Sequence, residues 1–249
     1  MKSHSTGKIR NAALTALLSS GIVSVAQAND TQDDGVISGT LSLDLNSHFI
    51  SYGFDVWGGA SSPSSAQTFN PSLELNWALT DNFTGIVGTW WDVNGNPGPG
   101  AAPTTGSDLQ EVDIWVGGTY TYEKFSITGL YQAWLYADNT EHIVDIILAY
   151  DTILSPSLTI HNRIDAGASG GQEGTILVAG VDLAAVTEDG LNAGPVSFGI
   201  PVNLAYFVNG DFHGALLESA GFGYGSIGLN ATYGMDFIDS KFGAWDIHA

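Results

Sequence analysis

The stretch Glu111-Val112-Asp113-Ile114-Trp115-Val116-Gly117-Gly118-Thr119-Tyr120 decides the fold class. In it, apolar Val112, Ile114 and Val116 alternate with acidic Glu111 and Asp113 and with Trp115. Because successive side chains of a β-strand point to opposite faces, this period of two predicts a strand with one apolar and one polar face.

The same alternation recurs along the chain, at 40–46, 72–79, 157–166 and 196–206. No window shows a sustained helical apolar face, and the 32 glycines would weaken any helix that contained them. We therefore expect an all-β chain. Its eleven candidate strands lie near 37–54, 69–79, 84–93, 109–120, 125–137, 141–151, 157–167, 175–186, 195–208, 217–233 and 241–249.

The charge is strongly one-sided. Residues 29–249 hold all 26 acids but only three of the six bases. Nucleic-acid binding needs clustered Lys and Arg, so the sequence excludes nucleic acid as a partner. A soluble β-sandwich, the competing architecture, carries surface charges of both signs, whereas many polar-face positions here are Gly, Ser, Thr or Asn. Aromatic residues near the strand ends also favour an antiparallel transmembrane β-barrel.

The first 28 residues predict a cleaved signal peptide. Bases at positions 2–10 precede an apolar run at 12–25 and the small-x-small motif Ala26-Gln27-Ala28. We expect 29–35 to be a polar lead-in and 36–249 to be the barrel. The expected location is the bacterial outer membrane, with its lipid as a partner. The chain has no cysteine, so disulfide bonds are excluded.

The number of candidate strands is odd, whereas bacterial single-chain barrels use an even number. The last segment, 241–249, stops within its pattern and lacks a terminal aromatic strand. We therefore expect a barrel of about twelve strands when complete, of which about eleven are present in a C-terminally truncated chain.

Acids on the polar strand faces are the candidate pore-lining residues. They would give the lumen a negative potential that attracts cations. We expect a porin-like channel that prefers cations and passes ions or small solutes by diffusion. The alternative is a structural or adhesive barrel with a closed lumen. The candidates are Asp44, Glu74, Glu111, Asp113, Asp145, Asp165, Asp182 and Asp246, together with His161 and Arg163.

Arg163 is the only arginine after residue 28. With His161 and Asp165 it forms an i, i+2, i+4 set, which predicts three side chains on one face of a strand. Such a set could form a salt-bridged plug or a constriction of the lumen.

Catalytic and metal-binding patterns are weak. Ser47-His48 and His161-Asn162 supply residue types for a lipid-modifying enzyme, but adjacent residues on a strand point to opposite faces, so we expect no enzyme. The histidines lack paired spacing. Asp92-x-Asn94-x-Asn96 resembles the start of a calcium loop, but Pro97 stands where the loop needs Gly. We expect neither a metal nor a cofactor.

Two segments carry a family resemblance. Ser47-His48-Phe49-Ile50-Ser51-Tyr52-Gly53 and Ala220-Gly221-Phe222-Gly223-Tyr224-Gly225-Ser226-Ile227-Gly228-Leu229 resemble segments of the TorF-like porins of proteobacterial outer membranes. The likeness extends over the chain after the signal peptide and rests on pattern more than on a diagnostic motif. It implies an outer-membrane location and a transport role, and it supplies no catalytic residue.

Overall fold

The computed structural model describes residues 37–56, 67–95, 108–167, 171–183, 191–214 and 219–249, and the backbone of 25–27. Within these ranges the regular structure is β, apart from short 3-10 turns such as η2 (Ser240–Phe242). The all-β prediction is therefore confirmed. Among the described residues, no helix has the length and apolar character needed to cross a membrane.

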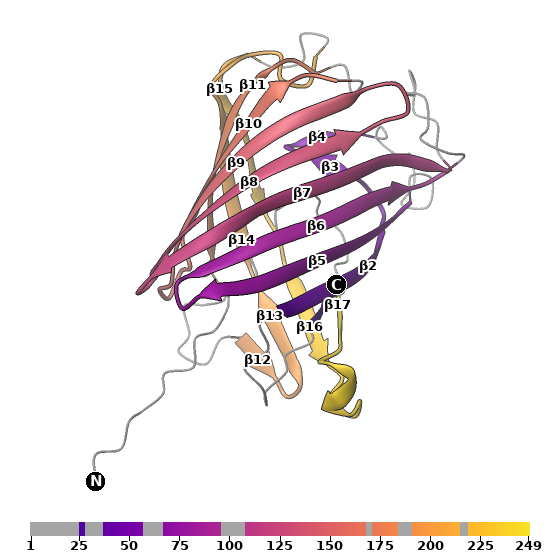
Figure 1. Ribbon diagram of the computed structural model, residues 1–249, viewed down its shortest axis with the longest axis vertical. Helices are drawn as coiled ribbons and strands as arrows, with labels where there is room; N and C mark the ends of the chain where they lie inside the picture. Colours follow the sequence, from indigo (N-terminus) through magenta and orange to yellow (C-terminus); the bar gives the residue numbers. More distant parts are fainter. Residues whose placement is uncertain are drawn as a thin grey trace.

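One large antiparallel sheet contains eleven strands. From β5 to β11 each strand pairs with the next one along the chain, which gives an up-and-down meander (Figure 1). The strands, in sheet order, are β1 (Val25–Gln27), β2 (Ile37–Asn46), β5 (Thr68–Thr80), β6 (Phe83–Val93), β7 (Leu109–Tyr122), β8 (Phe125–Leu135), β9 (Thr140–Tyr150), β10 (Ser157–Asp165), β11 (Gly174–Asp182), β14 (Pro201–Phe207) and β15 (Gly221–Ile227).

The two ends of the sheet differ in their connections. At one end, here called the turn end, the strands are joined by short segments at 81–82, 123–124 and 151–156. At the other end, here called the loop end, the segments at 47–67, 94–108 and 208–220 are longer. Two connections depart from this division: the short segment 136–139 lies at the loop end, and the long segment 183–200 joins β11 to β14 at the turn end.

A smaller sheet extends the large one beyond the turn end (Figure 1). Its order is β12 (Leu191–Ala193), β13 (Val196–Gly199), β16 (Asn230–Gly234) and β17 (Asp246–His248). Strand β17 lies against β1, so the two sides of the structure approach each other. No sheet closes on itself among the described residues.

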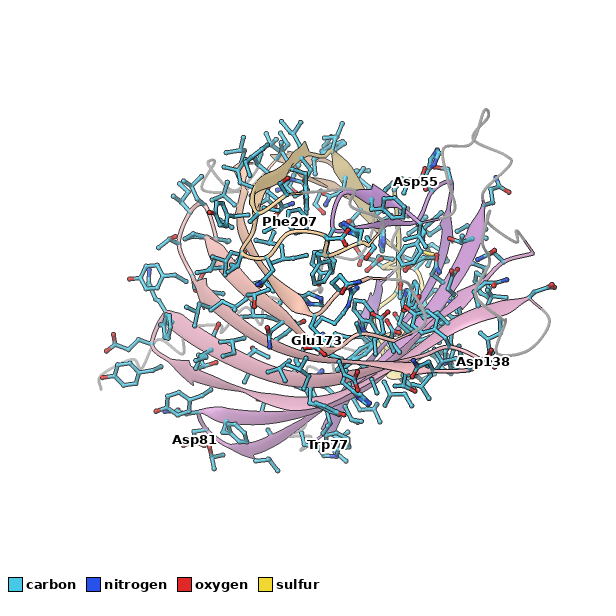
Figure 2. All side chains as sticks on the ribbon, turned by 90° about the horizontal axis from the view of Figure 1, so that it is seen from above. Asp55, Trp77, Asp81, Asp138, Glu173 and Phe207 are labelled. Atoms are coloured by element: carbon cyan, nitrogen blue, oxygen red, sulfur yellow. The ribbon has the colours of Figure 1, made fainter. Side chains whose placement is uncertain are left out.

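The sheet is inverted in polarity relative to a soluble protein. On β2, Ser42, Asp44 and Asn46 are buried at 3–7% exposure, whereas Leu41, Leu43 and Leu45 are 44–66% exposed. The strands curve around a central region that receives the buried side chains (Figure 2). We call this side the inner face. The outer face carries exposed apolar side chains on strand after strand, for example Ile114 and Val116 on β7 and Leu204 and Tyr206 on β14.

The expected continuous strand at 37–54 is wrong. Strand β2 ends at Asn46, and the chain then forms a separate hairpin, β3 (Ile50–Ser51) and β4 (Phe54–Asp55). Its turn residues Tyr52 and Gly53 have φ of 47° and 86°. Positive φ at both central residues is the geometry of a tight hairpin turn, which a continuous strand cannot contain.

Three other strands are shorter or divided. The expected strand at 195–208 divides between β13 and β14, where Pro201 has no N–H for the ladder. The one at 217–233 divides at Gly228 and Leu229 into β15 and β16. At 241–249 only β17 is a strand, because the segment before it forms the η2 turn. The predicted signal peptide and lead-in lie outside the described residues, except for the backbone of β1.

Candidate functional site

Buried carboxylates gather on the inner face toward the loop end. Among the described residues, six acids have at most 7% exposure. Five lie near the loop-side ends of β2, β6, β7 and β9, and the sixth, Asp145, lies in the middle of β9. The six are Asp44, Asp92, Glu111, Asp113, Glu141 and Asp145. The inner face at this end is therefore both polar and strongly acidic.

Arg163 is the one arginine or lysine that is buried in the described part of the chain. Its Nε lies 2.9 Å from Oε2 of Glu141. Its Nη1 donates to the carbonyl of Phe212 at 2.7 Å, and the guanidinium carbon lies 3.9 Å from the centre of the Phe212 ring. It also donates to the carbonyl of Gln172 at 3.3 Å. Arg163 thus connects two loop-end segments to the strands β9 and β10.

His161 connects the hairpin β3–β4 to the strands β9 and β10 of the large sheet. Its Nδ1 lies 2.8 Å from Oδ1 of Asp145 and 2.7 Å from the hydroxyl of Tyr52. Gln132 donates to the other oxygen of Asp145. Burial, with the negative charge of Asp145, raises the pKa of the Tyr52 hydroxyl well above its usual value. This hydroxyl therefore stays protonated at neutral pH.

Neutral donors surround the acids of β6 and β7. Asp92 and Glu111 are direct neighbours in the register of the two strands. The side-chain amides of Asn70 and Asn94 donate to Oδ1 of Asp92 at 3.1 and 3.0 Å, and the Tyr136 hydroxyl donates to Glu111 at 2.8 Å. Hydrogen bonds of this kind stabilise a carboxylate without removing its charge.

The predicted pore-lining residues do not form one set. Six of them are buried: Asp44, Glu111, Asp113, Asp145, His161 and Arg163. Glu74 is half-buried and accepts from the indole N–H of Trp115 at 3.1 Å. Asp182 accepts from the backbone N–H of Ile200 beside the turn end. Asp246 lies on β17, 3.1 Å from Nδ1 of His248.

The expected set of His161, Arg163 and Asp165 on one face is wrong. The register between β9 and β10 shifts between Arg163 and Asp165, and Asp165 is exposed. A shift of one residue moves a side chain to the other face of the strand. The carboxylate that pairs with Arg163 therefore comes from Glu141 on the neighbouring strand.

The hairpin β3–β4 and the loop at 208–214 fold onto the inner face (Figure 2). The rings of Tyr52 and His161 contact each other with their centroids 4.3 Å apart, and the ring centroids of Phe49 and Trp90 lie 5.2 Å apart. Phe212 is fully buried among Ile176, Val178, Ala205 and Phe207. These apolar contacts close much of the inner space at the loop end.

A cavity of about 900 Å³ borders the hairpin, the loop-side end of β2 and strand β15. Residues of the hairpin line it on one side, and residues of β9, β11, β14 and β15 line it on the others. The described residues that line the cavity include Asp145 but no lysine, arginine or histidine. They are Leu45, Asn46, Ser47, Ile50, Tyr52, Gly53, Gln67, Asp145, Ile147, Thr159, Val178, Pro201, Asn203, Tyr224, Gly225, Ser226, Ile227, Gly228, Leu229, Asn230 and Ala249.

The histidines do not form a recognisable catalytic relay. In a relay the two imidazole nitrogens contact different groups, whereas Asp145 and Tyr52 both approach Nδ1 of His161. His48 lies 3.1 Å from Asp55 within the hairpin. Within the described ranges, no three His, Asp or Glu side chains are placed to hold a metal ion.

Sequence reasoning missed Asp92 and Glu141 as members of the acidic cluster. Both follow the alternation that identified the others, because Asp92 lies two residues after Trp90 and Glu141 four residues before Asp145. Extending each period-two pattern to the strand end would have found them. Nothing in the sequence pointed to the contacts of Tyr52 and Phe212, because these residues lie outside the alternating segments.

No protein-family model, curated protein or solved structure matches this chain.

Proposed function

We propose that this protein is an outer-membrane β-barrel channel that prefers cations. The observation that carries the proposal is the inverted polarity of the sheet. Polar and charged side chains are buried on the inner face, while leucine, isoleucine and valine side chains are exposed on the outer face. Water disfavours such an outer surface, whereas the hydrocarbon of a bilayer favours it.

The aromatic residues of the outer face support a membrane location. Phe83, Tyr120, Tyr122, Phe125 and Tyr150 are exposed at the turn end, and the register joins them across β6, β7, β8 and β9. On β6 a second aromatic residue, Trp91, is exposed eight positions from Phe83. At ~3.3 Å per residue and a tilt of ~40°, these two rings are about 20 Å apart along the membrane normal, close to the apolar band of such barrels.

The expected pore is narrow. About twelve strands, ~4.8 Å apart and tilted by ~40°, give a backbone diameter of about 24 Å and, after side chains, a lumen of roughly 10–14 Å. The six buried acids facing one arginine make this lumen negative. Small cations are therefore attracted and anions repelled.

Conductance in a planar bilayer tests the proposal. Under a tenfold KCl gradient, the refolded protein is expected to give currents whose reversal potential has the sign of cation preference. Asp44→Asn combined with Asp92→Asn should lower the cation-to-anion permeability ratio by roughly threefold to tenfold, because two buried carboxylates of the inner face become neutral amides.

The matched control is Asp81→Asn combined with Glu123→Gln. It removes the same formal charge from exposed turns at the turn end. This control should leave the permeability ratio nearly unchanged because water screens exposed charges. An anion-preferring reversal potential, or an equal effect of the two double variants, would contradict cation selection by the inner acids.

A second candidate is a structural or adhesive barrel with a closed lumen. The observation that favours it is the packing of Tyr52 and Phe212 against the inner face. Such a barrel would insert into the bilayer and give no current, either as the natural chain or after release of the hairpin.

A further inference from the structure

The hairpin formed by residues 47–56 is built as a unit separate from the large sheet. Ile50 pairs with Asp55, Ser51 pairs with Phe54, and the N–H of Val56 donates to the carbonyl of Phe49. It contacts its surroundings through Phe49 on Trp90, Tyr52 on His161 and Phe54 on His213, and Nε2 of His213 lies 3.1 Å from the carbonyl oxygen of Ser51. The hydrogen bonds within the hairpin are separate from these contacts, so the hairpin can keep them when the contacts are lost.

The turn of the hairpin carries backbone strain. Tyr52 adopts φ of 47°, a left-handed conformation that is uncommon for a residue other than glycine, asparagine or aspartate. Such a conformation persists where the surrounding structure holds it, and it is found preferentially at functional and switch regions. Here the ring is held between His161 and Phe212, at centroid distances of 4.3 and 6.1 Å.

The hairpin lies at the edge of the cavity described above. Ile50, Tyr52 and Gly53 line the cavity on its loop-end side, while Gly228 and Asn230 line it near the turn end. The hairpin thus forms part of the boundary of this space, beside Asn46 and Ser47 at the end of β2. We propose that residues 47–56 form a gate, which closes the pore when Tyr52 rests on His161 and opens it when the hairpin moves away from the wall. This inference rests on the proposed channel function and adds its regulation.

A reversible cross-link tests the gate. A Cβ at Gly53 would lie 3.1 Å from Cβ of Tyr224, and the chain has no cysteine of its own. A disulfide needs a Cβ–Cβ distance of about 3.5–4.5 Å, so Gly53→Cys with Tyr224→Cys requires a small shift in this distance. The cysteine at position 53 also carries backbone strain, because φ of Gly53 is 86°, and the reduced form of the same protein is therefore the reference. We expect the oxidised protein to carry at most roughly one tenth of the current of the same protein after reduction.

A second variant releases the gate without a cross-link. Tyr52→Asn keeps a residue that tolerates positive φ but removes the ring from His161 and Phe212. The open probability should rise roughly tenfold, the factor that corresponds to about 1.4 kcal/mol. Tyr233→Asn makes the same chemical change on β16, away from the hairpin, and should leave the open probability unchanged.

The outcomes separate the two proposals. Equal currents in the oxidised, reduced and Tyr52→Asn proteins, with the disulfide verified by mass spectrometry, would overturn the gate and leave the channel function standing. The absence of current from all of them, in protein shown to be inserted in the bilayer, would overturn the channel function itself.

Discussion

Replacing Arg163 by methionine is expected to lower the free energy of unfolding by about 3–5 kcal/mol, the usual cost of removing one partner from a buried ion pair. The pair is fully enclosed, since Arg163 is 5% exposed and Glu141 is 0% exposed. Without the guanidinium, Glu141 keeps a buried charge that no other lysine or arginine of the described chain can reach. The carbonyls of Phe212 and Gln172 also lose the guanidinium donor, while the Phe212 carbonyl keeps its bond from the backbone N–H of Gln172. Urea unfolding in detergent micelles, followed by tryptophan fluorescence, measures the change.

Two further variants separate the charge effect from a general loss of packing. Adding Glu141→Gln to Arg163→Met should recover roughly half of the lost free energy, because the isolated buried charge is then removed. Lys241→Met breaks an ion pair of 2.8 Å whose side chains are 65% and 55% exposed. Its effect should be far smaller than that of Arg163→Met, because water already solvates both partners. Equal losses in the free energy of unfolding for Lys241→Met and Arg163→Met would contradict the idea that burial sets the cost of breaking the Arg163–Glu141 pair.

Replacing Val116 by arginine is expected to destabilise the protein in lipid vesicles by about 2–4 kcal/mol. Val116 is 55% exposed on the outer face, near the middle of β7. If that face contacts hydrocarbon, the guanidinium must enter the apolar centre of the bilayer. If it contacts water instead, an exposed substitution of this kind changes stability by about 0.5 kcal/mol at most.

The matched control is Ile153→Arg in the segment 151–156 that connects β9 and β10. Ile153 is 53% exposed, nearly the same as Val116, but it lies at the turn end. Arginine near the membrane surface costs about 0–1 kcal/mol. Urea titration of both variants in vesicles gives the comparison. Small and equal effects at the two positions would contradict the membrane location of the sheet.

The meander from β5 to β11 was the most predictable part of the fold. Its strands begin and end within a few residues of the expected ranges, because a period of two runs through most of their length. Prediction failed where a strand-like composition hides a turn. Residues 49–54 are rich in aromatic and β-branched types, yet Tyr52 and Gly53 reverse the chain through positive φ. Composition carries no information about that choice, which depends on what the turn contacts.

The sequence predicted that acids would gather on the inner face, but it did not identify all of the residues in the cluster. Alternation selected Glu111, Asp113 and Asp145 because side-chain direction follows from position along a strand. It failed for Asp165, because the register shift after Arg163 depends on pairing with β9. It could not give Glu141 as the partner of Arg163, since contacts between strands follow from register and not from spacing within one strand.

By itself the sequence determined the all-β architecture, the two unlike faces of each strand and the excess of acids, because these are local properties of residue order and composition. Only the tertiary structure decided that Tyr52 meets His161, that Arg163 meets Glu141 and Phe212, and that a hairpin lines a cavity. These contacts join residues up to 109 positions apart in the chain. Their geometry depends on strand register and on the path of the loops, which alternation along a single strand does not encode.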